Sequence, residues 1–399
     1  MAKHPSPVTQ EDNKRAIVLR DLDAQRITAA EASQSLGLTE RHVWRLLAAF
    51  RQEGRDALIH GNRGCTPITT LSPDVRQRVV ELARTKYHGF NHTHLTEKLR
   101  SDEKIMVSRS TVWRILHDAG MRSPQRHRRP KHRSRRERRP RAGMLLQLDG
   151  SDHDWLQERG PRLTLLGAVD DATGEVVAAL FRNEEDAHGY MLLLQRIVLQ
   201  RGIPLAVYAD QHSIFVHTPS GKESMEEQLA GVRAPTQVGR VLDDLAIELI
   251  TALSPQAKGR IERLWGTFQD RLVSELRLAG ISTRDDANRF LDSYLPTYNA
   301  QFARPPAETE NAYRPVPAKL DLGVIFSFQY GRLVAKDNTV RAGANLLQIP
   351  ANGYRSSYAK ARVLFCVGID GSTFVLHDGR RIAYQPATNP TADIRAEKR

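Results

Sequence analysis

One segment constrains the fold of this chain more than any other, because residues 122–141 carry eleven Lys and Arg side chains and a single acid, Glu137. The segment holds a net charge of +10, out of +13 for all 399 residues. Like charges repel at this density and almost nothing apolar is available for burial, so the segment cannot form a core. It predicts a linker between folded regions, and its charge favours a polyanionic partner whose neutralised phosphates release counterions.

The region before the linker repeats one helical pattern. The first copy spans residues 11–54 and the second spans residues 72–120, and each reads as helix, tight turn, helix. The sequence VWRLL at 43–47 recurs as VWRIL at 112–116, each time four residues after a Thr or Ser that can cap a helix. This match, at a separation of 69 residues, indicates an internal duplication.

Each copy predicts a helix-turn-helix DNA-binding domain. Thr28 and Thr39 are expected to cap two helices of the first copy, with Gly37 at the turn between them. Short polar and basic side chains at the start of the last helix suit base edges and phosphates in a major groove. The DNA contacts predicted on these helices are Arg41, His42, Arg45, Arg109, Ser110, Thr111 and Arg114. Those predicted in the linker are Arg126, Arg128, Arg129, Lys131, Arg133, Arg135, Arg136, Arg138 and Arg139.

Composition excludes several other classes of protein. Two cysteines, Cys65 and Cys366, cannot form a disulfide framework, and the spacing of Cys65 from His88, His92 and His94 fits no standard zinc site. The chain has no apolar run near 18 residues and no apolar stretch of a secretory signal at its start. We therefore expect a protein of a reducing cytoplasm with no membrane partner.

After Gly143 the pattern changes to that of an α/β domain. Short apolar runs alternate with amphipathic segments, which predicts a mixed sheet with helices packed on it. The expected elements are a strand that ends near Asp149, a hairpin over 162–181, a helix over 184–202, strands over 204–210 and 245–254, and a helix over 255–276.

Three acidic side chains stand out on these elements. Asp149 and Asp210 each follow an apolar strand, and Glu262 borders the apolar stripe of the long helix. Two aspartates and a glutamate that converge would form an oxygen-rich site for Mg²⁺ or Mn²⁺, and two such ions can clamp the attacking and leaving oxygens of a phosphoryl transfer. Four further acids are alternatives to Asp149 in this role: Asp152, Asp154, Asp170 and Asp171. Of these, Asp170 and Asp171 fit a hairpin turn best.

Four segments resemble bacterial insertion-sequence transposases of the ISNCY group, which have a retroviral-integrase-type DDE catalytic core. They are LQLDG at 146–150, YAD at 208–210, SPQAKGRIERLW at 254–265, which is the most specific, and YNAQF at 298–302. The resemblance implies an RNase H-like fold in which Asp149, Asp210 and Glu262 bind two Mg²⁺ or Mn²⁺ ions. It also implies that Lys258 and Arg263 approach DNA phosphates, and that the chain forms a dimer or higher oligomer on DNA. By the same resemblance we expect a cytoplasmic, nucleoid-associated bacterial protein.

The chain departs from this family pattern in two places. Fifty-one residues separate Asp210 from Glu262, more than in the commonest insertion-sequence cores, although the ISNCY resemblance accommodates the longer interval. The excess falls in the polar segment 211–237 and predicts an inserted loop. In addition, Arg-Pro-Pro stands at 304–306, where the family has Arg-Pro-His after the Tyr-Asn motif.

The region from residue 309 onward predicts a small, all-β, barrel-like domain. Its segments alternate apolar and polar residues, and the Asp-Gly pairs at 370–371 and 378–379 are typical of hairpin turns. The predicted domains are therefore 1–60 and 61–121 (helix-turn-helix), 122–142 (linker), 143–308 (catalytic core), 309–387 (β domain) and 388–399 (disordered tail).

Together these features predict a DNA transposase that binds the terminal inverted repeats of its element, cleaves the ends and joins the 3′-ends to target DNA. Two alternatives remain at this point. One is a metal-dependent nuclease of the same fold, which would hydrolyse DNA without joining it. The other is a DNA-binding regulator derived from a transposase that has lost catalysis.

Overall fold

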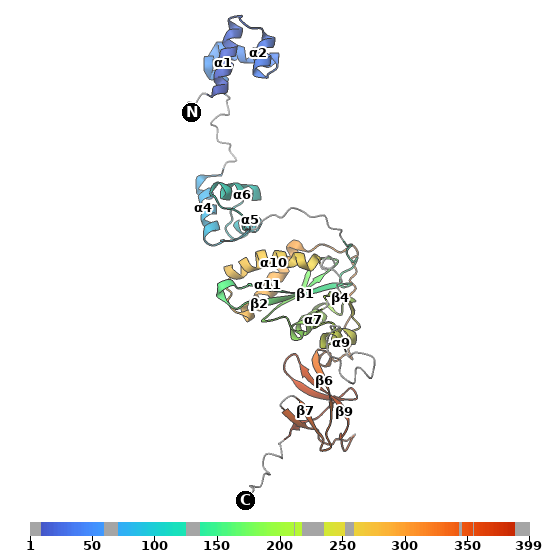
Figure 1. The fold of residues 1–399 in the computed structure, drawn as a ribbon. Helices are drawn as coiled ribbons and strands as arrows, with labels where there is room; N and C mark the ends of the chain where they lie inside the picture. The colour runs from blue at the N-terminus through green and yellow to red at the C-terminus, as the bar shows by residue number, and fades with distance from the viewer. Residues whose placement is uncertain are drawn as a thin grey trace. The chain divides into compact units, whose positions relative to one another are not determined.

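The computed structural model describes residues 9–59, 71–124, 136–210, 212–217, 235–251, 259–342, 345–353 and 355–387. Its internal contacts divide it into two compact units, residues 1–78 and residues 79–399 (Figure 1). Across the described residues, no helix is both long enough and apolar enough to cross a membrane. Most of the predicted inserted loop and the whole predicted disordered tail lie outside the described residues.

The first unit packs short helices around a small apolar core. They are α1 (Gln10–Asp23), α2 (Ala29–Leu36), α3 (Glu40–Glu53) and the 3-10 helix η1 (Gly54–Leu58). Thr28 caps α2 in a capping box with Glu31, and Gly37 ends α2 with a φ of 66°, which glycine adopts without strain. Thr39 occupies the N-cap position of α3 but makes no side-chain cap hydrogen bond. The predicted order of helix, tight turn and helix is confirmed.

The second copy forms α4 (Pro73–Arg84), α5 (His92–Ser101) and α6 (Arg109–Asp118), and Ser108 caps α6. The repeated pentapeptide has the same environment in both copies. Val43 and Val112, its first residues, are fully buried, whereas the tryptophans that follow, Trp44 and Trp113, are 51% and 50% exposed. The duplication therefore presents equivalent helix faces.

A five-stranded mixed sheet forms the centre of the second unit, and the predicted fold class is confirmed. Its strands are β1 (Leu146–His153), β2 (Leu163–Asp170), β3 (Val176–Arg182), β4 (Ala206–Ala209) and β5 (Glu248–Thr251). The order is β3-β2-β1-β4-β5. The first three strands are antiparallel, β4 runs parallel to β1, and β5 runs parallel to β4.

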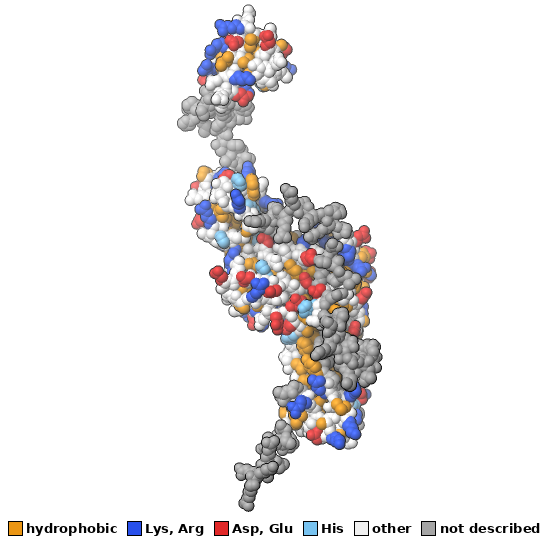
Figure 2. Space-filling model, in the orientation of Figure 1, with side chains coloured by type: hydrophobic (Ala, Val, Ile, Leu, Met, Phe, Trp, Pro, Cys, Tyr) orange, Lys and Arg blue, Asp and Glu red, His pale blue; other side chains and the backbone are white. Residues whose placement is uncertain are grey.

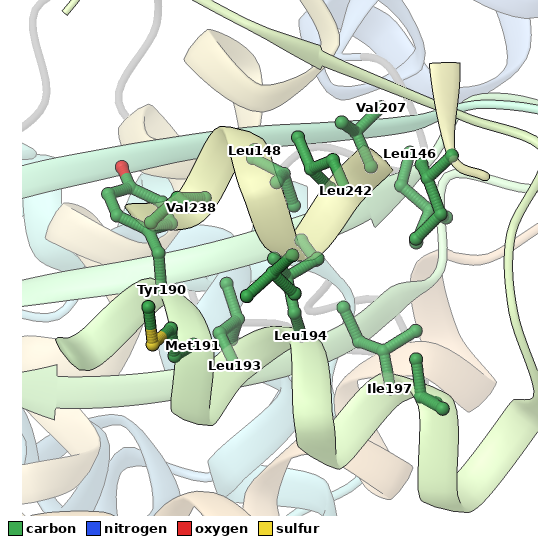
Figure 3. Packing of buried hydrophobic residues seen from close by; sticks show 14 of the residues in the cluster. Leu146, Leu148, Tyr190, Met191, Leu193, Leu194, Ile197, Val207, Val238 and Leu242 are labelled. Carbon is green, nitrogen blue, oxygen red and sulfur yellow. The ribbon is translucent and has the colours of Figure 1, made fainter. Parts of the chain in front are cut away.

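Helices cover both faces of this sheet (Figure 1). On one face, α7 (Ala187–Arg201) and α9 (Gln237–Asp244) pack their apolar side chains against Leu146 and Leu148 of β1 (Figure 3). On the other face, α10 (Gly259–Leu278) and α11 (Arg284–Phe302) pack on β2 and β3 through a second cluster that includes Trp265 and Phe268. Because both faces are covered, β2 is buried along its whole length, which explains its largely apolar sequence, LTLLGAVD.

The C-terminal region is all-β, apart from the short helix α12 (Leu322–Ile325). It has one sheet in the order β11-β10-β9-β6 and another in the order β12-β8-β7. The strands are β6 (Ser327–Leu333), β7 (Thr339–Ala342), β8 (Asn345–Gln348), β9 (Arg362–Gly368), β10 (Thr373–His377), β11 (Arg380–Ile382) and β12 (Gln385–Pro386). Asp378 and Gly379 both have positive φ between β10 and β11, as the predicted two-residue hairpin turn requires.

Charged side chains join α5 of the second helical region to α10. Arg271 donates to both carboxylate oxygens of Glu97, at 2.6 and 3.0 Å. Glu275 pairs with His94 at 2.6 Å and with Lys98 at 2.9 Å. His94, one of the histidines considered for a zinc site, is thus engaged by a carboxylate. No group of three or more potential metal ligands gathers within the described ranges.

The Glu275 pairing predicts a loss of stability in acid. Burial alone would raise the pKa of the Glu275 carboxyl, but hydrogen bonds from His94 and Lys98 outweigh it and hold this pKa below its usual value of 4.5. The stabilisation is therefore present above pH 4.5 and is lost as the pH falls through the lower, folded-state pKa. Glu275→Gln should lower the free energy of unfolding by about 2 kcal/mol at neutral pH and flatten its decline in acid, as measured by urea denaturation across pH.

Glu248→Gln, at an exposed carboxylate on β5, is the matched control and should leave that decline unchanged. The assignment is wrong if Glu275→Gln and the wild type lose stability in parallel below pH 4.5.

Candidate active site

Asp149 and Asp210 come together because β1 and β4 are adjacent parallel strands. Gln147 of β1 pairs with Tyr208 of β4, and each aspartate lies two residues beyond its member of that pair. Side chains two residues apart share a face of a strand. The two aspartates therefore lie side by side, Asp210 directly after the end of β4 and Asp149 midway along β1, and both are half-buried.

A ladder of three hydrogen bonds fixes α10 along β1. The backbone N–H of Ile261 donates to Oε1 of Gln147 at 3.2 Å, and Nε1 of Trp265 donates to Oδ2 of Asp149 at 2.9 Å. One turn further along, Nε2 of Gln269 donates to Oγ of Ser151 at 3.2 Å. Every fourth residue of the helix thus meets every second residue of the strand.

Glu262 directly follows Ile261, which makes the first of these three hydrogen bonds, and lies in the first turn of α10. Its side chain is exposed, between the buried Ile261 and the next turn of the helix. Although the structure brings Asp149 and Asp210 together and holds the Glu262 helix against β1, the three carboxylates do not gather as one ligand cluster in the described part of the chain. Gln211 and residues 252–258, which adjoin Asp210 and α10, lie outside the described residues.

Trp265 contributes more than the apolar packing expected from the sequence. Asp149 pairs across the strands with Gly167 of β2, and a Cβ atom at Gly167 would lie 2.6 Å from Cη2 of the Trp265 indole. The glycine therefore leaves room for the ring that orients the Asp149 carboxylate. A buried tryptophan requires an acceptor for its N–H, which is the signal that sequence reasoning missed.

A fourth carboxylate, Glu185, also lies beside β1, and sequence reasoning did not find it. The hydroxyl of Tyr190 donates to Oε1 of Glu185 at 2.6 Å, and a Cβ atom at Gly150 would lie 2.6 Å from its Oε2. Burial raises the pKa of Tyr190 well above its usual range, and the charges of Glu185, Asp149 and Asp210 raise it further. The phenol therefore stays protonated and remains a donor to Glu185.

The other acids near β1 have different surroundings. Asp152 is exposed and pairs with Arg162 at 2.9 Å, and Asp154 is exposed. Asp170 and Asp171 are buried at the turn between β2 and β3. Asp170 accepts hydrogen bonds from the backbone N–H groups of Ala172 and Thr173, as expected for a turn residue.

The predicted DNA contacts on the helices are at the surface. Arg41, Arg45, Arg109, Ser110 and Arg114 are exposed, and His42 and Thr111 are half-buried. Figure 2 shows Lys and Arg side chains over the described surface of each unit. In the linker and core, Arg136, Arg138, Arg139 and Arg263 are exposed. The remaining predicted contacts, Arg126, Arg128, Arg129, Lys131, Arg133, Arg135 and Lys258, lie outside the described residues.

Comparison with known proteins supports this organisation. Residues 15–77 match the winged helix-turn helix family. The "Putative transposase y4bF" of Sinorhizobium fredii (strain NBRC 101917 / NGR234) is 34% identical over 351 residues, which cover 84% of this chain and 75% of that protein. The "Transposase for insertion sequence IS1202" of Streptococcus pneumoniae is 31% identical over 404 residues, covering 91% and 84% respectively.

The chain belongs to the insertion-sequence transposase family. This transposase is also similar to a chain in the structure of the simian T-cell lymphotropic virus intasome in complex with PP2A regulatory subunit B56 gamma. The identity is 16% and the TM-score 0.32, over 78% of the transposase and 99% of the viral chain. That likeness is too weak to support a conclusion. The matches to the two transposases, by contrast, cover 84% and 91% of the chain and support a DNA-binding transposase.

The contact between Trp265 and Asp149 predicts a stability effect in this transposase. Trp265→Phe removes the indole donor and part of the buried ring, and should lower the free energy of unfolding by about 2–3 kcal/mol in urea denaturation. Trp113→Phe, at a half-exposed indole, is the matched control and should change it by less than about 0.5 kcal/mol. Equal losses in the two variants would show that the Asp149 contact adds nothing.

Proposed function

We propose that this transposase cleaves the ends of its mobile element and joins the 3′-ends to target DNA by phosphoryl transfer at Asp149, Asp210 and Glu262. The observation that carries the proposal is the side-by-side position of Asp149 and Asp210 on neighbouring parallel strands. α10, which bears Glu262, is hydrogen-bonded along β1 of the same pair.

The donor set fits hard divalent cations. All three groups are carboxylates, and Asp149 and Asp210 occupy corresponding positions on neighbouring parallel strands, which suits Mg²⁺ or Mn²⁺ rather than a softer metal. Two such ions, when bound, would activate the attacking oxygen and stabilise the leaving 3′-oxygen. Within the protein, the Trp265 N–H fixes the orientation of the Asp149 carboxylate. The hydroxyl of Tyr190 holds the Glu185 carboxylate beside Gly150, the residue that follows Asp149 on β1.

The helical regions supply DNA recognition in this proposal. The N-terminal ends of α3 and α6 present the exposed Arg41 and Arg109, together with the other predicted contacts of each helix, to terminal inverted repeats. We assign residues 1–60 and 61–121 to two helix-turn-helix DNA-binding domains, 122–142 to the basic linker, 143–308 to the catalytic core and 309–387 to the β domain. Assembly as a dimer or higher oligomer would let one complex hold two element ends.

The catalytic assignment predicts that substitutions at the three carboxylates abolish DNA cleavage and joining but leave DNA binding intact. Asp149→Asn, Asp210→Asn and Glu262→Gln should each bind duplexes that carry a terminal repeat with wild-type affinity, yet neither nick nor join them in Mg²⁺. Gel-shift binding and strand-transfer assays with labelled oligonucleotides measure the two properties. Asp152→Asn is the control on the same strand, because its exposed carboxylate pairs with Arg162, and it should retain both activities.

Strand transfer at the wild-type rate by any of the three variants would contradict the assignment. Hydrolysis of ends without joining by the wild-type protein would identify a nuclease instead, and metal-independent binding with no cleavage would identify a regulator.

The assignment of α3 to the DNA interface predicts a change in how DNA affinity depends on salt concentration. Each phosphate contact contributes roughly 0.9 to the slope of log Kd against log salt concentration, so replacing Arg41 and Arg45 together by Ala should make that slope shallower by roughly 1–2. Arg26→Ala, an exposed arginine outside α3 that pairs with Asp21, should leave it unchanged. Fluorescence anisotropy across a salt series measures both, and an unchanged slope in the double variant would exclude α3 from the DNA interface.

A further inference from the structure

Asp171 is a buried carboxylate that the proposed chemistry does not use. Its side chain is fully buried at the end of β2, and four donors from separate parts of the chain converge on it. Arg136 and Arg260 donate to Oδ1, the latter at 2.6 Å, as does Nε2 of Gln147 at 2.9 Å. The backbone N–H of Arg139 donates to Oδ2 at 2.9 Å. A hairpin turn alone requires none of these four bonds.

One side of this network holds the end of the arginine-rich linker. Arg136 and Arg139, which bond to Asp171, lie in the described end of this linker, residues 136–142. Arg138 joins them by donating to the carbonyl of Ala172 at 2.9 Å. Arg260 also donates to the carbonyl of Arg136 at 3.1 Å. Two guanidinium groups thus share one carboxylate, and without its charge they would repel each other.

The other side of the network reaches the first turn of α10. Gln147 is fully buried, and its amide donates to Asp171 while its Oε1 accepts from the backbone N–H of Ile261. The first N–H groups of a helix have no acceptor within the helix, so Gln147 satisfies one of them. Asp171 therefore holds this turn twice, through Gln147 and through Arg260. The next residue after Ile261 is Glu262.

We propose that Asp171 is a positioning residue, which fastens both the end of the basic linker and the first turn of α10 to β2 so that Glu262 and the linker arginines are held beside β1. The proposal rests on the function assigned above to Glu262. Asp171 acts through Gln147 and Arg260 and does not itself touch DNA.

The adjacent residue provides a matched comparison. Asp170 is buried to the same degree, but its carboxylate accepts from Gly143, Ala172 and Thr173. None of these contacts reaches the linker arginines or α10. Replacing either aspartate by Asn removes one buried negative charge from the same turn, and only the Asp171 change affects the network around Glu262.

The first measurement is hydrogen exchange on the full-length protein, without DNA or metal. Asp171→Asn should speed exchange of the amides in residues 259–265 by at least about tenfold, because Gln147 and Arg260 lose their common acceptor. Asp170→Asn should leave them within about twofold of wild type. Gln147→Leu, which retains Asp171 and its arginines, should reproduce the fast exchange, and it decides the question if Asp171→Asn does not fold.

The second measurement is the rate at which each variant cleaves the element ends in Mg²⁺. This rate is divided by the fraction of folded protein, which thermal melting gives. Asp171→Asn should lower kcat roughly 10- to 100-fold with KM changed much less, as expected when a catalytic group is displaced, whereas Asp170→Asn should retain wild-type kcat. The proposal is overturned if residues 259–265 exchange at the wild-type rate in Asp171→Asn or Gln147→Leu, or if Asp170→Asn matches Asp171→Asn in both measurements. A wild-type protein that cleaves no DNA would refute the proposed function, while the exchange result would still decide the role of Asp171.

Discussion

The register between α10 and β1 is the constraint on which the candidate site depends. Residues on one line of a helix repeat every four positions, about 6.0 Å, and residues on one face of a strand repeat every two, about 6.6–6.8 Å. Because these lengths nearly agree, Ile261, Trp265 and Gln269 can each bond to β1 in turn. A shift of α10 by one residue would break all three bonds, so the position of Glu262 relative to Asp149 is set by the whole ladder.

The polar groups of these three bonds select one register between α10 and β1 more than they increase the free energy of unfolding. An amide buried without a partner costs about 1–3 kcal/mol, and Gln147, which is fully buried, avoids that cost only when both of its polar atoms are bonded. Apolar packing between α10 and β2 would tolerate small slides, whereas the Gln147 amide does not. The aromatic contact adds a steric limit, because Gly167 leaves space for the Trp265 ring opposite Asp149.

The elements of the fold followed from local sequence, but the partners of the site did not. Apolar runs that end in Asp149 and Asp210 predicted two strand ends. The end before Asp210 is confirmed, whereas the end near Asp149 is wrong, because β1 continues to His153 in its pairing with β2. The cap at Thr28 and the Asp-Gly pair at 378–379 predicted local structure that is confirmed. Trp265 was assigned only to an apolar stripe, since its acceptor lies more than a hundred residues earlier. Asp171 was read as a turn residue for the same reason: its donors come from the linker, β1 and α10, which no local pattern brings together.

The two ends of α10 have different partners, one at the end of the basic linker and one in the second helical region. The helix has 20 residues and is about 30 Å long. Its first turn is bonded to β1 and, through Arg260, to the end of the basic linker. Its later turns are bonded to α5 through Arg271 and Glu275. The linker therefore starts after a helical region that packs on α10 and ends against the first turn of the same helix.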